Sequence, residues 1–247
     1  MHDTASAKAL AMGLDFRARP DATFFVLSGP GGTGKTTLIK RWLADCSDLG
    51  YVANVTTRKP RPAAAVNESG FYEFVSRADF QRRVRANEFA QWVNPSAGKY
   101  YGTPIAPLQK AIDDGRDLVF DYTPQLYVNL RRQFKRQVVG IFIVPPTFAE
   151  LMRRLQQRGT ESGEELLIKQ QMAVQDINYV DEHQYHVIND DVDAALATLK
   201  SIRTAERCLM SRVQGLQDRC KQASPRTMLF YYDPLGDRVS SMAAECP

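Results

Sequence analysis

The sequence predicts an α/β protein with a three-layer core around a parallel sheet, and three observations support this fold class. First, β-rich apolar runs at residues 23–28, 117–121 and 137–144 read as buried strands of such a sheet. Second, segments with helical spacing of apolar residues lie between them. Third, a glycine-rich loop joins the first run to the helix that follows it.

The glycine-rich loop has the pattern G-x-x-x-x-G-K-[ST], which is typical of the phosphate-binding loop (P-loop) of NTPases. Glycines let backbone N–H groups turn toward a polyphosphate, the lysine adds a positive charge, and the threonine hydroxyl can bind Mg²⁺. We therefore expect ATP or GTP, together with Mg²⁺, to bind at the loop residues Gly29, Pro30, Gly31, Gly32, Thr33, Gly34, Lys35, Thr36 and Thr37.

A second strand is predicted at residues 51–56, and it leads into a basic loop at residues 57–62. Pro60 and Pro62 keep their neighbours extended, which limits the entropy lost when arginines bind an anion. In isolation, a solvated basic loop is an equally good interpretation. After a phosphate-binding loop, a second phosphate site is the better one.

A half-buried strand is expected at residues 71–75. Ser76 with Asp79 resembles a capping box, which opens a helix predicted to run through Phe89. The basic residues of that helix are interpreted as its solvent-facing side: Arg82, Arg83 and Arg85. Strands at residues 91–93 and 99–103 follow, and Pro104 starts another helix at its first turn.

Asp121 ends the buried run at residues 117–121, where enzymes with a phosphate-binding loop often hold the magnesium shell. Thr147 with Glu150 forms a second capping box, for a helix that carries Arg153, Arg154 and Arg158. A polar, glycine-containing break at residues 159–165 then predicts a lid that closes on phosphates. The alternative is a helix hairpin with a solvated basic face.

A last short strand is predicted at residues 187–188, and a helix begins at Asp190 and is expected to continue towards Gln222.

Composition excludes several classes of protein. No run of about 18 apolar residues predicts a membrane span, and the N-terminus lacks the apolar segment of a secretory signal, so we expect a cytoplasmic protein. The four cysteines are far apart, which favours reduced thiols over a disulfide framework or zinc site.

The formal net charge of +4 is too small to indicate a protein that coats nucleic acid, but local basic clusters suit a small polyanion. We therefore expect small-molecule nucleotide substrates as partners, with no nucleic acid and no membrane. The sequence leaves the oligomeric state open.

From about residue 24 to residue 200 the chain resembles the guanylate kinase family, enzymes that use Mg²⁺ and move the γ-phosphoryl group of ATP to GMP. Six motifs in order carry the resemblance: Gly29-Pro30-x-Gly32-x-Gly34-Lys35-Thr36, Thr56-Thr57-Arg58-x-Pro60-Arg61, Tyr72-x-Phe74-Val75-Ser76, Tyr100-Tyr101-Gly102-Thr103, Arg154-Leu155-x-x-Arg158-Gly159-Thr160 and Val187-Ile188-Asn189-Asp190.

The resemblance implies a role for each matching residue. The acceptor phosphate would be held by Arg58, Arg61, Tyr72 and Tyr101, with Thr103 and Asp121 also in the acceptor site. Arg154 and Arg158 would neutralise the transferring group together with Lys35 and Arg58, and Asn189 would lie near the adenine. Thr36 and Asp121 would hold the metal.

The resemblance also implies a division of the chain. The kinase domain would span residues 22–200, with an inserted small mixed β subdomain for the acceptor at about 54–103 and a helical lid at about 154–175. Residues 1–21 would form an N-terminal extension and residues 201–247 a helical C-terminal one.

The chain departs from the family mainly where the acceptor base is read. A serine, a glutamate and an aspartate read guanine in the family, and the matching positions are Asn54, Gln91 and Thr123. A carboxylate accepts both N1–H and N2–H of guanine, whereas an amide offers one acceptor and one donor. The glutamate after the second loop arginine is also missing, unless Glu68 replaces it, and an additional lid arginine is replaced by Gln170.

These departures leave four hypotheses open. The first is a nucleoside monophosphate kinase whose acceptor base is not guanine, and the second is a true guanylate kinase that makes GDP from GMP. The third is a degenerate module that binds a phosphorylated ligand without turnover. The fourth is a sugar-bisphosphate-forming kinase of related fold. Intact Lys35, Thr36 and Asp121 argue against the third hypothesis.

Overall fold

The computed structural model describes residues 21–60, 70–96, 98–157 and 163–212. The expected helical C-terminal extension beyond residue 212, and the N-terminal one before residue 21, lie outside the described residues. Within residues 21–212 the order of strands and helices matches the predicted α/β class, with a parallel sheet and a smaller mixed sheet.

The larger sheet has five parallel strands in the order β2-β7-β1-β8-β9. Their bounds are Gly50–Tyr51 for β2, Leu118–Asp121 for β7, Phe24–Ser28 for β1, Val138–Val144 for β8 and Tyr185–Ile188 for β9. The central strand β1 is buried at every residue, which agrees with its prediction from an unbroken apolar run. Its carboxyl end lies between β7 and β8, the place where open α/β sheets bind ligands.

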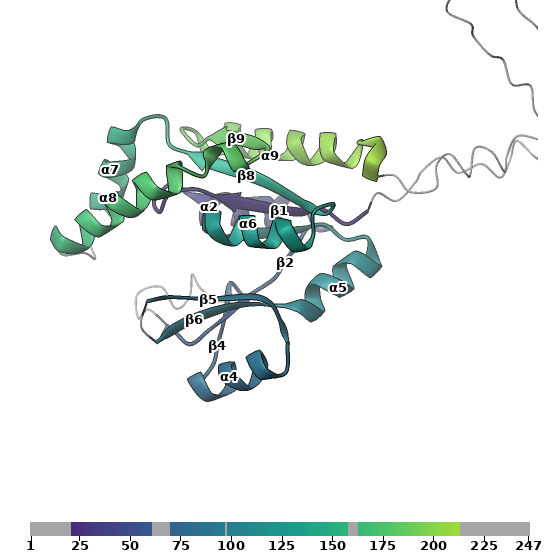
Figure 1. Ribbon diagram of the computed structural model, residues 1–247. Coiled ribbons are helices and arrows are strands. Elements are labelled where there is room, and N and C mark those ends of the chain that lie inside the picture. The colour runs from purple at the N-terminus through teal and green to yellow at the C-terminus, as the bar shows by residue number, and fades with distance from the viewer. Residues whose placement is uncertain (1–20, 61–69, 97, 158–162, 213–247) are drawn as a thin grey trace, which may run out of the picture. The chain divides into compact units, whose positions relative to one another are not determined.

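Helices cover both faces of this sheet. Alternate residues of β1 point to opposite sides, so that Phe25 and Leu27 pack against α2 (Lys35–Asp45) and α9 (Val192–Arg207). Phe24 and Val26 pack against α5 (Ile105–Asp114) and α6 (Pro124–Gln133) on the other side. Figure 1 shows α9 and α6 on opposite sides of the sheet. Helix α6 was not predicted, although Pro124 at its first position is a typical start signal.

The smaller sheet has the order β4-β3-β6-β5, with β3 and β4 parallel and the other pairs antiparallel. Its strands are Tyr72–Phe74 (β4), Asn54–Thr56 (β3), Lys99–Pro104 (β6) and Phe89–Ser96 (β5). The single strand predicted at residues 51–56 is wrong, because the chain leaves the larger sheet after Tyr51 and enters the smaller one at Asn54. A short apolar run cannot reveal such a change of sheet.

Helix α4 (Arg77–Arg85) packs on one face of the smaller sheet through Phe80, which stacks on Phe89 with ring centroids 4.7 Å apart. The predicted cap is confirmed, since Ser76 Oγ accepts from the Asp79 N–H at 3.1 Å. The helix ends at Arg85 rather than continuing through Phe89, because the left-handed Asn87 (φ 53°) turns the chain into β5.

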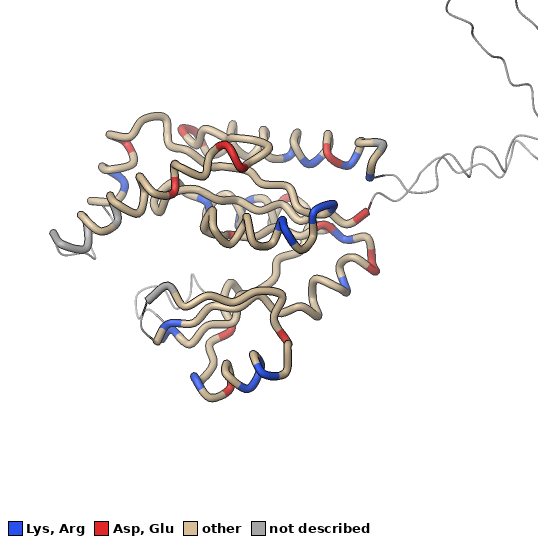
Figure 2. Tube along the Cα trace, viewed as in Figure 1, with Lys and Arg blue, Asp and Glu red and all other residues tan. Residues whose placement is uncertain are grey.

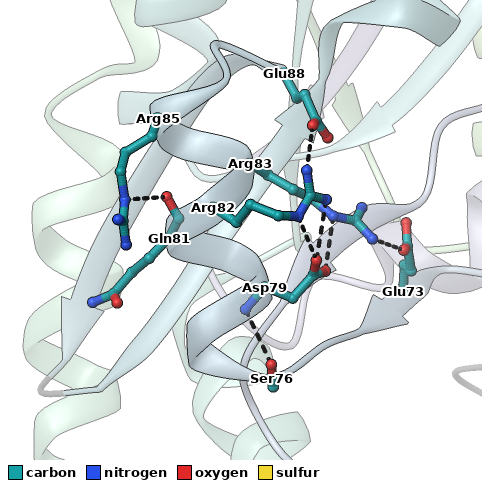
Figure 3. Close-up of polar contacts among 8 residues, drawn as sticks. All are labelled: Glu73, Ser76, Asp79, Gln81, Arg82, Arg83, Arg85 and Glu88. Carbon is teal, nitrogen blue, oxygen red and sulfur yellow. Dashed lines mark hydrogen bonds and ion pairs between the residues drawn. The ribbon is translucent and has the colours of Figure 1, made fainter.

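The basic residues of α4 form ion pairs with neighbouring carboxylates, as Figure 3 shows. Arg82 pairs with Asp79 and Glu88, and Arg83 pairs with Asp79 and Glu73. The predicted solvent-facing side is confirmed for Arg82 and Arg85, which are exposed, whereas the side chain of Arg83 is only 20% exposed. Figure 2 shows the same pattern more widely, with charged residues on the outer helices and few on the strands of the larger sheet.

The predicted lid region contains two helices, α7 (Phe148–Gln157) and α8 (Gly163–Ile177), which pack through Leu151, Leu155 and Ala173. The second predicted cap is also confirmed, since Thr147 Oγ1 accepts from the Glu150 N–H at 3.0 Å. Arg158 and most of the predicted break lie outside the described residues. Gln170, at the position of the missing arginine, is half-buried on α8.

Helix α9 ends at Arg207 and is followed by a single 3-10 turn at Met210–Arg212, so its predicted continuation towards Gln222 is wrong within the described residues. A short 3-10 turn at Val180–Glu182 connects α8 to β9. Within the described ranges, no helix is long and apolar enough to cross a membrane.

Candidate active site

The glycine-rich loop follows β1 and ends at the start of α2, which is the predicted strand–loop–helix arrangement. Gly29 and Gly34 have φ values of 129° and 90°, in the region that favours glycine. A Cβ on Gly29 would collide with the carbonyl oxygen of Ile143, and one on Gly34 with the side-chain nitrogen of Asn189. Both positions therefore require glycine for space as well as for backbone conformation.

The Lys35 side chain folds back over the loop. Its Nζ donates to the carbonyl oxygens of Gly29 at 2.7 Å and Pro30 at 2.9 Å. The Thr33 hydroxyl donates to the same Pro30 carbonyl at 3.0 Å. The loop thus holds an ammonium group at the N-terminus of an 11-residue helix, and the charge and the helix dipole together attract a phosphate.

Thr36 and Asp121 bring a hydroxyl and a carboxylate together beside the loop. Thr36 Oγ1 donates to Asp121 Oδ2 at 2.8 Å, although the two residues are 85 positions apart in the chain. Both groups are oxygen ligands of the kind that Mg²⁺ prefers. Among the described residues, no cluster of three or more His, Cys, Asp or Glu side chains could hold a metal. A metal at this pair would therefore need phosphate oxygens as well.

Asn189 supports the loop from the end of β9. Its Nδ2 donates to the carbonyl oxygen of Thr33 at 2.7 Å, and the residue is only 3% exposed. Its Oδ1 is buried and has no partner among the described residues. The contact places Asn189 against the phosphate-binding loop, so the structure adds a positioning contact to the adenine role that the resemblance implied.

Arg154 lies beside Asn189 at the start of the lid region. Its Nη1 donates to the Asn189 carbonyl oxygen at 3.0 Å, and its Nε pairs with Glu150 at 2.6 Å. Arg153 pairs with the same carboxylate, and the two guanidinium groups lower the pKa of Glu150 to about 2. Glu150 thus holds one of the two predicted lid arginines.

Four residues form a polar row across the smaller sheet, one from each strand: Tyr72, Asn54, Thr103 and Gln91. Asn54 is opposite Tyr72, and Gln91 is opposite Thr103. Thr103 Oγ1 donates to Asn54 Oδ1 at 3.2 Å, which joins the two pairs. Because opposite residues in a ladder share a face, all four side chains lie on the face away from α4. The fold therefore brings together four residues that were predicted to lie in the acceptor site.

Arg58 lies at the Tyr72 end of the polar row. Its guanidinium carbon is 5.2 Å from the centroid of the Tyr72 ring and 5.4 Å from that of Phe74. Tyr101 is packed edge-on against Tyr72, with ring centroids 6.3 Å apart. The structure thus groups three of the four residues predicted to hold the acceptor phosphate, and the fourth, Arg61, lies outside the described residues.

A cleft of about 970 Å³ runs between the smaller sheet and the carboxyl end of the larger one. Of the residues that the sequence singled out, its lining contains Asn54, Tyr72, Gln91, Tyr101, Thr103, Asp121 and Thr123. Thr123 is exposed at the start of α6, where its side chain does not cap the helix. One cleft therefore contains both the polar row and Asp121, the hydrogen-bond partner of Thr36.

Sequence reasoning did not single out several polar residues of the cleft lining, among them Tyr122 and Asp176. Tyr122 is fully buried between Asp121 and Thr123, and its hydroxyl makes a short hydrogen bond to the Thr103 hydroxyl. Asp176 on α8 lies near enough to Lys35 for the two charges to interact, and burial raises the pKa of its carboxyl. Neither belongs to a motif, so only the fold could place them in the cleft.

Comparisons with known proteins agree with this geometry. Residues 21–206 match the profile of the family described as "Guanylate kinase". The chain is 39% identical to a guanylate kinase of Novosphingobium aromaticivorans over 194 residues, which cover 78% of this chain and 86% of that protein. It is 37% identical to a guanylate kinase of Maricaulis maris, over 82% of this chain and 92% of that protein.

The fold is also similar to that of a solved structure. The crystal structure of guanylate kinase from Anaplasma phagocytophilum has a TM-score of 0.66 to this chain, with 23% sequence identity. The similarity covers 83% of this chain and 96% of the other. It supports the architecture of two sheets described above.

Proposed function

The chain belongs to the guanylate kinase family, and from this premise we propose that it transfers the γ-phosphoryl group of ATP to the phosphate of GMP, giving ADP and GDP. Family membership makes the chain a nucleoside monophosphate kinase. The named relatives favour GMP over the different acceptor base suggested by the departures at Asn54, Gln91 and Thr123. They offer no support for a module without turnover or for a sugar-bisphosphate-forming kinase.

The observation that carries the proposal is the cleft that contains both Asp121 and the polar row. Asp121 is hydrogen-bonded to Thr36 of the phosphate-binding loop, and Tyr72 at the other side contacts Arg58. A triphosphate at the loop and a monophosphate at Arg58 would therefore meet end to end in one cleft. Such an arrangement supports direct transfer, because the two reacting phosphates need only proximity and alignment.

In the proposed reaction, an anionic oxygen of the GMP phosphate attacks the γ-phosphorus of ATP, and the bond to the β–γ bridging oxygen breaks. The acceptor oxygen is already ionised, so no general base is needed. Lys35 and the loop N–H groups hold the β and γ phosphates, and the lid arginines spread the negative charge that develops. Thr36 and Asp121 would hold Mg²⁺ together with phosphate oxygens, and the ion would neutralise part of the phosphate charge.

The direct test is a coupled assay of ADP release with ATP, Mg²⁺ and a panel of nucleoside monophosphates. The panel contains GMP, its deoxy form, AMP, CMP and UMP, with sugar phosphates as further acceptors. We expect GMP-dependent ADP release well above the background hydrolysis of ATP, with GDP as the second product. ADP release that does not depend on GMP would overturn the proposal.

A further inference from the structure

The amide of Gln91 is the least satisfied polar group of the cleft wall. The residue is 7% exposed and lines the cleft, and neither its Oε1 nor its Nε2 has a partner at full hydrogen-bond geometry among the described residues, although the amide lies close enough to the Tyr122 hydroxyl to lower the pKa of that group. Two unpaired buried atoms on one side chain are costly, because each has lost its hydrogen bonds to water. The arrangement suits a ligand that offers one donor and one acceptor side by side.

Asn54 adds a donor to this arrangement. The Tyr122 hydroxyl and the Thr103 hydroxyl are hydrogen-bonded, and Thr103 donates in turn to Asn54 Oδ1. Burial raises the pKa of Tyr122, so its hydroxyl keeps its proton and can donate to Thr103. With Oδ1 used in this way, Asn54 offers its Nδ2 to a ligand in the cleft. The polar row thus offers two amide donors and one amide acceptor.

The position of the row suits the base of a nucleotide. The row crosses three strand spacings of about 4.8 Å each, from Tyr72 beside Arg58 to Gln91. This length is comparable with that of a nucleoside monophosphate. If the phosphate lies at Arg58, the base therefore reaches the Gln91 end.

The pattern of donors and acceptors selects among bases. A 6-oxopurine offers its O6 carbonyl beside N1–H, which complements an amide nitrogen and an amide oxygen. Adenine offers the reverse pattern, an amino donor beside the N1 acceptor, which Gln91 matches when its amide is rotated, so that the second donor, Asn54 Nδ2, is what favours a 6-oxo over a 6-amino group. The 2-amino group of guanine needs a further acceptor, and Asn54, Gln91 and Thr123 include no carboxylate to serve it.

Two carboxylates do line the same cleft, but both are associated with the phosphate-binding loop. Asp121 accepts from Thr36, and the charge of Asp176 interacts with that of Lys35. Neither is a member of the polar row. The polar row therefore has no carboxylate that could accept a hydrogen bond from the 2-amino group of a purine bound at Gln91.

We propose that the polar row recognises the O6 and N1–H groups of a 6-oxopurine and does not read position 2, so that inosine monophosphate (IMP) is an acceptor alongside GMP. This inference rests on the phosphoryl transfer proposed above. Gln91 is its specificity-determining residue. A site rejects an analogue strongly only where the missing group leaves a buried protein partner unpaired, and loss of the 2-amino group leaves no carboxylate of the row unpaired, while the exposed Thr123 hydroxyl can bind water instead.

The test is the ratio of kcat/KM for GMP, IMP and AMP in the full-length protein. We expect GMP and IMP to agree within about tenfold, which corresponds to about 1.4 kcal/mol. AMP is expected to be at least about a hundredfold poorer, because its amino group faces a donor. A preference for GMP over IMP above a hundredfold would overturn the inference and leave the proposed function intact.

The Gln91→Glu variant tests the residue itself. A carboxylate accepts both N1–H and N2–H, so the ratio of GMP to IMP kcat/KM should rise at least about tenfold. Gln81→Glu is the matched control, because it adds the same charge to α4, on the other face of the smaller sheet, and should leave the ratio unchanged. An equal ratio in Gln91→Glu and wild type contradicts the assignment.

A second variant and a binding measurement cover the remaining outcomes. If Gln91→Glu does not fold, as judged by circular dichroism, Gln91→Met keeps the volume and should lower kcat/KM for GMP and IMP by the same factor. If the protein phosphorylates neither nucleotide, the proposed function fails, and calorimetry then decides the inference. Similar Kd values for GMP and IMP support it, whereas binding of GMP alone, or of neither, overturns it.

Discussion

The phosphate-binding loop and the polar row differ in how far their polar side chains are hydrogen-bonded within the protein. In the loop, Lys35 and Thr33 have hydrogen bonds to loop carbonyls, and Thr36 has one to Asp121. In the polar row, both amide atoms of Gln91 are buried without a partner among the described residues. The loop is thus held by its own contacts, whereas in the row Asn54 and Thr103 have such contacts and Gln91 lacks them.

This difference explains why one site is recognised from a short motif and the other is not. Contacts between neighbours in the chain, such as Thr33 to Pro30, leave a fixed local pattern in the sequence. The contacts of the polar row join residues as far apart as Asn54 and Thr103. The residues proposed to decide ligand specificity therefore belong to a site that is assembled by long-range contacts.

The largest expected effect tests the loop. Lys35→Ala removes the ammonium group that would contact the β and γ phosphates, and we expect kcat to fall by about 10³-fold or more. The Kd for GMP should stay within about twofold, since the polar row is separate. Lys110→Ala is the control, because that exposed lysine only pairs with Asp114 on α5. An unchanged kcat in Lys35→Ala would contradict the proposed kinase mechanism.

The next effect tests the acceptor side. Arg58→Ala removes a predicted charge-assisted hydrogen bond to the acceptor phosphate, worth about 1.5–3 kcal/mol. The KM for GMP should rise about 10- to 100-fold, while the KM for ATP changes little. Arg77→Ala provides the control, since that arginine stacks on Tyr100 of the same subdomain. A larger change in KM for ATP than in KM for GMP would contradict this division.

A smaller effect tests how the loop is held. Asn189→Ala removes the bond to the Thr33 carbonyl, a contribution of about 1 kcal/mol. We expect the KM for ATP to rise about fivefold with the KM for GMP unchanged, as measured by steady-state kinetics. If the KM for GMP rises instead, Asn189 acts on the acceptor side and the proposed positioning role is wrong.

The smallest effect concerns Glu150, whose pKa is lowered from 4.5 to about 2 by Arg153 and Arg154. A lowered pKa means that the carboxylate stabilises the fold above pH 4.5 and loses this contribution as the pH falls toward 2. Arg153 is exposed, so salt should weaken its contact with Glu150. The Tm difference between wild type and Glu150→Gln should therefore shrink between pH 6 and pH 3, and shrink also in 1 M NaCl. A constant difference would indicate that Glu150 stabilises α7 by other contacts.

Much of the core followed from the sequence because its signals are local. The unbroken apolar run of β1 predicted a strand buried on both faces, and the side chains of Ser76 and Thr147 predicted two helix caps. The six ordered motifs predicted the family that the comparisons then showed. The failures also have local causes: no residue marks the change of sheet after Tyr51, and a single Pro124 was too weak a signal for α6.

The sequence by itself determined the strand–loop–helix arrangement of the glycine-rich loop, because a loop and its helix make most of their contacts within a few positions. Only the tertiary structure decided which distant polar groups pair. Asp117, at a strand start, is buried against Arg203 and Arg207 of α9, and Tyr122 completes the hydrogen bonds of Thr103. The tertiary structure also decided that the Gln91 side-chain amide has no hydrogen-bond partner at full geometry among the described residues. Satisfaction of a buried group depends on every neighbour that folding brings to it, and this information is not contained in any single stretch of the chain.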